Sequence, residues 1–276
     1  MKSDIIPIFN EKKCPTKIMG VINANEDSFF KNSRFEGINA ISKIEQMIED
    51  GADIIDIGGV SSRPGSVVVS SKEELNRVSP IIDLIKEQKL YEKVKFSLDS
   101  YEPDVLKYAL DRGFKIVNDI TGLENDEVCK IAAEYSASVV IMHMQNNPEN
   151  MQENPEYNDV IREINKFFQE RIDKAKSFGI KDIILDVGIG FGKTLDHNLA
   201  LIKNLGYFKH FEYEILMAAS RKSMIDMITP TKTEDRLPGT LAIHLESIRN
   251  GASIVRCHDV KEHFQAIKVQ EAILTS

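Results

Sequence analysis

Residues 51–59, GADIIDIGG, contain the pattern on which the fold depends. Gly51 stands where a left-handed helix cap is expected, and the run after it is almost continuously apolar, as in a parallel strand buried on both faces. Asp56 interrupts this run near its end. The segment therefore predicts the end of a helix, then a buried strand, then a polar side chain at the carboxyl end of that strand.

The same unit recurs along the chain. Glycines of the same kind precede later apolar runs at Gly113, Gly179 and Gly251, and amphipathic stretches with helical spacing, such as residues 41–48, separate the runs. Eight strands are predicted, at residues 17–23, 52–59, 94–100, 115–120, 138–144, 182–188, 214–220 and 253–258. The chain therefore alternates between buried strands and surface helices.

Eight strand–helix units without a Pro- or Ser-rich linker favour a closed barrel. We predict the α/β class and a single (β/α)8 TIM barrel, forming one domain over residues 1–276 with residues 1–16 as an N-terminal extension. A doubly wound open sheet is the alternative, because periodicity alone does not show that a sheet closes.

The composition narrows the possible partners. The chain of 276 residues has 35 basic and 43 acidic side chains, a net charge of −8, and this acidic balance argues against a nucleic-acid partner. It shows neither a signal peptide nor an apolar run long enough to cross a membrane, so we expect a cytoplasmic protein without a membrane partner. Cys14, Cys129 and Cys257 are widely spaced and indicate reduced thiols rather than a zinc site.

Polar side chains stand at or just beyond the carboxyl end of every predicted strand. They are Asn23, Asp56, Asp99, Asn118, His143, Asp186, Arg221 with Lys222, and Arg256 with His258. In a parallel barrel these ends meet on one face, where active sites lie. Any one of them could be a strand-end salt bridge, but buried charges are costly unless paired, so their joint occurrence favours a ligand site.

The chemistry of these side chains divides into two sets. Acceptors suited to the amino-pyrimidine edge of a flat heterocycle come from Asp99, Asn118 and Asp186. Donors and a metal-binding amide oxygen, suited to phosphate or pyrophosphate, come from Arg63, Arg256, His258 and Asn23. The glycine-rich residues 185–194 fit neither the Walker A nor the GxGxxG spacing, so a nucleotide is not expected.

Eight segments in order resemble the dihydropteroate synthases, the folate-pathway branch of the pterin-binding barrel family. They are MGVINANEDSFF (19–30), DIGGVSSRPG (56–65), LDS (98–100), VNDI (117–120), HMQ (143–145), LDVGIGFGK (185–193), SRKSM (220–224) and RCHDV (256–260). The motifs SSRPG and SRKS favour the synthases over their corrinoid-dependent methyltransferase relatives.

The resemblance implies a transferase of folate biosynthesis. It would condense 6-hydroxymethyl-7,8-dihydropterin pyrophosphate with p-aminobenzoate, releasing pyrophosphate and forming 7,8-dihydropteroate. It also implies Mg²⁺ as the cofactor, sulfonamides as inhibitors and a homodimer. An aniline is a neutral nucleophile that needs no activating base, so we expect SN1-like substitution with Mg²⁺-assisted departure of pyrophosphate.

Carried over motif by motif, the resemblance also implies roles for particular residues. The pterin set is Asp99, Asn118, Met142, Asp186, Phe191 and Lys222, and the pyrophosphate set is Asn23, Arg63, Arg256 and His258, with Asn23 on the metal. The p-aminobenzoate set is Ser62, Arg63, Pro64 and Ser223. The expected catalytic residues are Asp27, Arg63, Lys222, Arg256 and His258.

The first loop departs from the family pattern. Where the family usually has Asn-x-Thr-Pro-Asp-Ser-Phe, this chain has Asn25 and Glu26 in place of Thr and Pro, which removes a rigid proline and adds a negative charge. A pterin-binding protein without transferase activity is therefore an alternative, and a corrinoid methyltransferase is a weaker one. Residues 146–159 indicate a polar loop without an assigned role.

Overall fold

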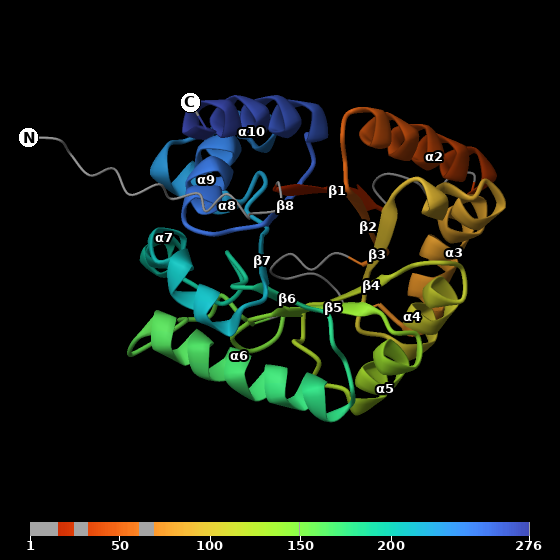
Figure 1. The fold of residues 1–276 in the computed structure, drawn as a ribbon, viewed down its shortest axis with the longest axis horizontal. Helices are drawn as coiled ribbons and strands as arrows, with labels where there is room; N and C mark the ends of the chain where they lie inside the picture. Colours follow the sequence, from red (N-terminus) through yellow and green to blue (C-terminus); the bar gives the residue numbers. More distant parts are fainter. Residues whose placement is uncertain (1–15, 25–32, 61–68, 149, 276) are drawn as a thin grey trace, which may run out of the picture.

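The computed structural model describes residues 16–24, 33–60, 69–148 and 150–275 (Figure 1). Eight parallel strands close a barrel in sequence order, which confirms the TIM barrel and excludes the open sheet. The strands are β1 Lys17–Asn23, β2 Ile54–Gly58, β3 Lys95–Asp99, β4 Ile116–Asp119, β5 Ser138–Met142, β6 Ile183–Asp186, β7 Glu214–Met217 and β8 Ile254–Cys257.

Helices surround the barrel (Figure 1). They are α2 Ser33–Glu49, α3 Ser71–Glu87, α4 Pro103–Leu110, α5 Asp126–Glu134, α6 Val160–Ser177, α7 Leu195–Lys203, α8 Ser223–Ile228, α9 Leu237–Arg249 and α10 Val260–Thr275, with short 3-10 turns η1 Leu90–Glu92, η2 Leu205–Phe211 and η3 Thr233–Asp235. The glycines predicted to end four helices, at positions 51, 113, 179 and 251, all have positive φ. Each lets the chain turn from a helix into the next strand.

The predicted strands were too long at several carboxyl ends, most clearly at β5, β6 and β7. After β6, Gly188 has a φ of +66° and donates its N–H to Asp186 Oδ1 at 2.7 Å. The backbone therefore turns onto the last side chain of the strand instead of extending to Gly188. Apolar character continues past the strand ends, which is why the sequence pattern did not show where they stop.

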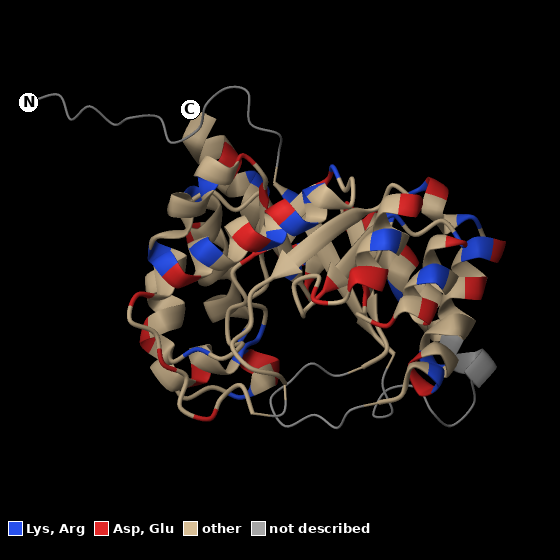
Figure 2. Cartoon of the chain, turned by 90° about the horizontal axis from the view of Figure 1, so that it is seen from below, with Lys and Arg blue, Asp and Glu red and all other residues tan. Residues whose placement is uncertain are grey.

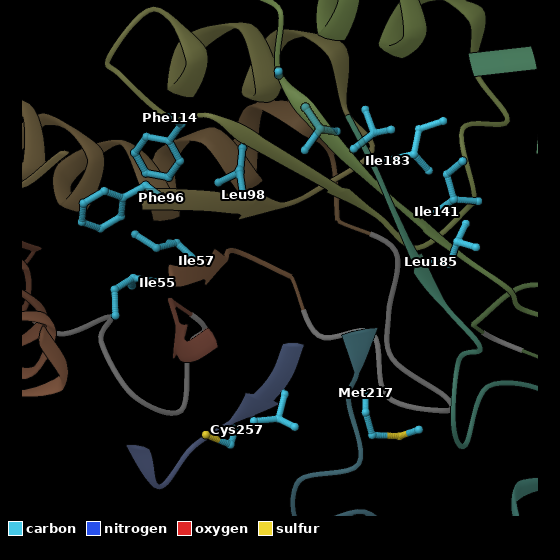
Figure 3. Packing of buried hydrophobic residues seen from close by; sticks show 14 of the residues in the cluster. Ile55, Ile57, Phe96, Leu98, Phe114, Ile141, Ile183, Leu185, Met217 and Cys257 are labelled. Atoms are coloured by element: carbon cyan, nitrogen blue, oxygen red, sulfur yellow. The ribbon is translucent and has the colours of Figure 1, made fainter. Parts of the chain in front are cut away.

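The core has two layers, as in other closed barrels. Side chains on the outer face of the strands, among them Ile57, Leu98 and Leu185, pack in the large cluster between barrel and helices (Figure 3). A smaller cluster, the inner apolar layer, fills the barrel and consists of Met19, Ile54, Ile116, Val140, Ile184, Leu216, Ala218 and Ile254.

Side chains alternate along each strand, so the residue two positions after a member of the inner apolar layer also points inward. On four strands that next inward residue is polar: Asp56, Asn118, Asp186 and Arg256. Asp99 occupies the equivalent place two residues after the buried Ser97. We call these five residues the polar layer. The alternation of the strands therefore places them together toward the carboxyl end of the barrel.

Charged side chains of both signs are interspersed over the outer helices (Figure 2). Among the described residues, no helix is both long and apolar enough to cross a membrane, and no group of three or more His, Cys, Asp or Glu side chains could hold a metal ion. Cys129 and Cys257 are buried and free, as expected for reduced thiols.

Candidate active site

Arg256 is the centre of the polar layer. Its Nε donates to Asp56 Oδ2 at 2.7 Å and its Nη2 donates to Asp99 Oδ2 at 2.8 Å. Asn118 Nδ2 donates to the same Asp56 oxygen at 3.1 Å. These contacts join β8, β2, β3 and β4 across the barrel interior, because β8 neighbours only β1 and β7 in the sheet. One guanidinium therefore holds two carboxylates that lie far apart in the sequence.

The two predicted sets of site residues meet at this point. Arg256, from the pyrophosphate set, is in direct contact with Asp99, from the pterin set. Burial raises the pKa of the Asp99 carboxyl, while the positive charge of Arg256 lowers it. The carboxylates Asp56 and Asp99 together keep Arg256 charged. Residues of the two predicted sets therefore belong to one connected network of ion pairs and hydrogen bonds.

Lys222 closes the other side of the site. It follows β7, and its Nζ donates to the carbonyl of Ile189 and lies 4.3 Å from the centre of the Phe191 ring. Burial lowers the pKa of Lys222 to about 8, although the Asp186 carboxylate raises it. Burial in turn raises the pKa of Asp186, while the Gly188 N–H and Lys222 lower it. The structure thus brings Asp186, Phe191 and Lys222 together, three residues of the predicted pterin set.

His258 is positioned by Ser220. Its Nδ1 lies 2.9 Å from Ser220 Oγ, and its backbone N–H donates to the same oxygen at 3.3 Å. A hydroxyl that accepts from the backbone can donate to Nδ1, which leaves the imidazole proton on Nε2. Burial, followed by the charge of Arg256, lowers the pKa of His258 to about 4. His258 is therefore a neutral hydrogen-bond donor at neutral pH.

The segment after β7 is held by an ion pair. Arg221 donates from Nε and Nη2 to the two oxygens of Asp259 at 2.9 and 2.7 Å. Its own N–H donates to Thr240 Oγ1 at 2.9 Å. Arg221 therefore fixes the backbone between Ser220 and Lys222. These contacts are with Asp259 and Thr240, not with residues of the polar layer.

The remaining predicted residues lie around this cluster or outside the described part of the chain. Met142 is buried at the end of β5, beside Asp186 in the register, and Asn23 ends β1. Ser223 is exposed at the start of α8. Four predicted residues lie outside the described residues: Asp27, Ser62, Arg63 and Pro64. Their assigned roles stay predictions.

Three residues of the site received no role from the sequence. Asp56 was recognised as a strand-end carboxylate but not as the partner of Arg256, and Ser220 was not linked to His258. Lys193 was quoted within a motif, yet it is 3% exposed and surrounded by carbonyl oxygens. The alternation of side chains along the strands predicts an inward position for Asp56 as it does for Asp99 and Asn118, so the sequence did contain a signal for Asp56. The sequence gives no comparable signal for Lys193, since a lysine after glycines usually faces solvent.

Comparison with known proteins identifies the family to which the chain belongs. The sequence profile described as "Pterin binding enzyme" matches residues 19–258. The chain is 42% identical over 257 residues to the bifunctional dihydropteroate synthase/dihydropteroate reductase of Helicobacter pylori, covering 93% of this chain and 68% of that protein. It is 40% identical over 262 residues to the dihydropteroate synthase of Escherichia coli, covering 94% and 92% of the two chains.

The structural comparison agrees. The Yersinia pestis dihydropteroate synthase, solved in complex with a sulfonamide drug, superimposes with a TM-score of 0.88 and 35% identity over 95% of each chain. Both the whole-length sequence match and the fold therefore agree with the network of inward-facing charges described above. This chain belongs to the pterin-binding enzyme family, among its dihydropteroate synthases.

Proposed function

We propose that this chain is a transferase that condenses 6-hydroxymethyl-7,8-dihydropterin pyrophosphate with p-aminobenzoate, releasing pyrophosphate and forming 7,8-dihydropteroate. The observation that carries the proposal is the polar layer, in which Asp99, Asn118 and Asp186 share the barrel mouth with Arg256. Carboxylates that point inward at a barrel mouth suit a ring with amino and imino donors, and the neighbouring cation suits an anion.

The pterin would lie between the polar layer and the turn after β6. Asp186 and Asp99 supply acceptors for the pyrimidine donors, and Asn118 supplies both an acceptor and a donor. Met142 and Phe191 offer apolar surfaces to the ring. Because both carboxyls have pKa values raised by burial, a ligand that donates to them also relieves part of their desolvation.

The pyrophosphate would lie nearer β8 and β1. Arg256 uses Nε and Nη2 on the two aspartates, which leaves Nη1 for an anion. His258 would donate from its neutral imidazole, since its pKa of about 4 keeps it uncharged. The predicted p-aminobenzoate contacts are Ser62, Arg63, Pro64 and Ser223, and we propose Arg63 and Asp27 as further catalytic groups on the strength of the resemblance alone.

Magnesium fits this arrangement at Asn23. The residue points inward by alternation with Met19, and its amide makes no hydrogen bond within the described part of the chain. An amide oxygen is a donor that Mg²⁺ accepts, and this ion usually takes its other ligands from substrate phosphates and water. Bound there, Mg²⁺ would supply positive charge against the departing pyrophosphate.

The chain's own residues would favour a dissociative reaction. The carboxylates on the pterin side stabilise positive charge that develops on the ring, while Arg256 and His258 stabilise negative charge on the leaving group. The aniline nitrogen of p-aminobenzoate needs orientation but no base in order to attack. We therefore propose an SN1-like substitution in which bond breaking precedes attack.

Pyrophosphate release tests this proposal. Purified protein is given the pterin pyrophosphate and Mg²⁺, with and without p-aminobenzoate, and a sulfonamide is added as a competitor. Release that depends on p-aminobenzoate and is reduced by the sulfonamide supports the synthase. Binding of the pterin without turnover would support the alternative binding protein.

We also propose a cytoplasmic homodimer. Exposed apolar side chains on α10, including Phe264 and Val269, support an association through outer helices. Light scattering during size-exclusion chromatography gives the oligomeric state directly, and a monomeric mass at working concentration would contradict the dimer.

A further inference from the structure

Lys193 is a buried lysine whose contacts are carbonyl oxygens. Its Nζ donates to the carbonyls of Gly188 and Phe191 at 2.9 Å and of His143 at 3.2 Å, and lies 3.0 Å from the His143 ring Nδ1. None of these contacts is with a carboxylate. An ammonium has three N–H donors, so the four acceptors around it use its full capacity.

Core packing alone does not explain a lysine at this place. Burial lowers the pKa of Lys193 well below its ordinary value, which means that the surroundings disfavour the charge. A methionine would fill a similar volume without that desolvation. What distinguishes Lys193 from a methionine is its N–H donors, which gather carbonyls from two different segments around one point.

The segment that Lys193 gathers carries much of the proposed pterin pocket. Phe191 belongs to it, and the Ile189 carbonyl accepts from Lys222. Gly188 begins it and donates to Asp186. The turn is pressed against the end of β5, since a Cβ at Gly188 would lie 1.9 Å from the His143 carbonyl oxygen. Its shape therefore decides where three of the predicted pterin residues stand.

Side chains also hold this turn from outside. Gln152 Nε2 donates to the Gly190 carbonyl at 2.7 Å, and the Tyr157 hydroxyl donates to the Gly192 carbonyl at 2.8 Å. Both belong to residues 146–159, the polar segment without an assigned role. All five consecutive carbonyls of residues 188–192 thus accept a hydrogen bond from a side chain. A turn without a regular backbone ladder is fixed instead by Lys193, Lys222, Gln152 and Tyr157.

We propose that Lys193 is a positioning residue for the pterin substrate, and that Gln152 supports the same turn from the outside. This inference rests on the proposed function. The donors set the turn before the ligand arrives, so the pterin does not have to order it on binding. Because p-aminobenzoate is assigned to other segments, loss of these donors should affect the two substrates unequally.

The test compares Lys193→Met with Lys203→Met, a control at an exposed position in α7. Calorimetry measures binding of 6-hydroxymethylpterin, and steady-state kinetics give KM for each substrate. We expect Lys193→Met to weaken pterin binding and raise the pterin KM by about tenfold or more, while KM for p-aminobenzoate stays within about twofold. The control should match the wild type. Pterin binding unchanged in Lys193→Met, or both KM values raised equally, would overturn the proposal.

Gln152→Ala keeps the proposal testable if Lys193→Met does not fold, because Gln152 is exposed. We expect a melting temperature like that of the wild type and a pterin dissociation constant raised about threefold or more, with KM for p-aminobenzoate unchanged. An unchanged pterin dissociation constant would contradict the proposal that Gln152 supports the turn at residues 188–192. Wild-type protein that does not bind pterin would instead contradict the proposed function, so the two failures are distinguishable.

Discussion

The inner apolar layer and the polar layer of this barrel use the same strand geometry for opposite purposes. On β2, β4, β6 and β8, an isoleucine of the first layer is followed two residues later by an Asp, Asn or Arg of the second. The apolar layer is closed by packing alone. In the polar layer one guanidinium joins Asp56 to Asp99, and Asp56 Oδ1 keeps no hydrogen-bond partner among the described residues.

The difference shows how stability and binding are divided along the barrel axis. Apolar side chains that fill a closed barrel stabilise it without recognising a ligand. Buried charges that lack hydrogen-bond partners cost stability, and a ligand can supply those partners. Mutations in the two layers should therefore separate stability from substrate affinity.

The largest effect is expected when the polar layer loses Arg256, the cation that contacts both Asp56 and Asp99. Arg256→Met leaves the buried Asp56 and the largely buried Asp99 without their partner, so we expect the free energy of unfolding to fall by about 3 kcal/mol or more, with loss of turnover. Urea unfolding at neutral pH measures this. Arg249→Met, at the exposed end of α9, is the control. A loss equal to that of the control would show that the ion network is not what closes this layer.

A mutation in the apolar layer should show the opposite division. Ile184→Ala leaves a cavity inside the barrel, two residues before Asp186, and should lower the free energy of unfolding by about 2–4 kcal/mol. Because Ile184 makes no polar contact with the site, KM for both substrates should remain near the wild-type values. Steady-state kinetics on the folded variant check this, and a selective rise in the pterin KM would contradict the separation of the layers.

A smaller effect concerns Glu74, a buried carboxyl that has, among the described residues, no ion pair like the one between Asp99 and Arg256. Burial raises its pKa from 4.5 to about 7, against a hydrogen bond from Ser100, and its Oε1 has no partner among the described residues. The folded protein therefore binds this proton more tightly than the unfolded chain does. Its contribution to stability is complete below about pH 4.5 and is lost as the pH rises through about 7.

Glu74→Gln should remove that dependence. At pH 8 we expect the variant to be more stable than the wild type, by on the order of 1–3 kcal/mol relative to their difference at pH 5. Denaturant unfolding at the two pH values measures it. Glu87→Gln, at the exposed end of α3, should not reproduce the change. If the wild type and Glu74→Gln keep a constant difference across this range, the carboxyl does not titrate as described.

The smallest expected effect is a decrease in kcat/KM at alkaline pH. The pKa of Lys222 is lowered to about 8, so its ammonium is lost as the pH rises through that value. We expect kcat/KM for the pterin substrate to fall about tenfold per pH unit above this point. Lys222→Arg should move the fall to higher pH, since a guanidinium stays charged. A fall at the same pH in the arginine variant would exclude Lys222 as its origin.

Much of this arrangement could be predicted from the sequence, because a parallel barrel ties the position of a residue to its place on a strand. The residues at the strand ends, from Asp99 to Asp186, followed from eight apolar runs and the rule that their carboxyl ends meet. Contacts across the interior did not follow. Asp56 and Arg256 stand 200 positions apart and meet only because the barrel closes and its strands are staggered.

Lys193 shows the other limit. Its role depends on a turn in which Gly188 takes a positive φ and carbonyls from two segments converge, and neither feature has a periodic signature. The end of β6 was misplaced for a similar reason, since the hydrogen bond from the Gly188 N–H to Asp186 Oδ1 turns the backbone while the apolar pattern continues.

The central claim is that the polar layer is the site of pterin transfer, and product formation by Asp186→Asn tests it most directly. The variant keeps the size of the side chain but removes one acceptor charge at the pterin edge. Dihydropteroate and pyrophosphate are quantified together in the wild type and the variant, with melting temperatures to establish folding. The account predicts equal amounts of both products from the wild type and a loss of about 100-fold or more in kcat/KM from a folded variant. Wild-type turnover that the folded variant retains in full would contradict it.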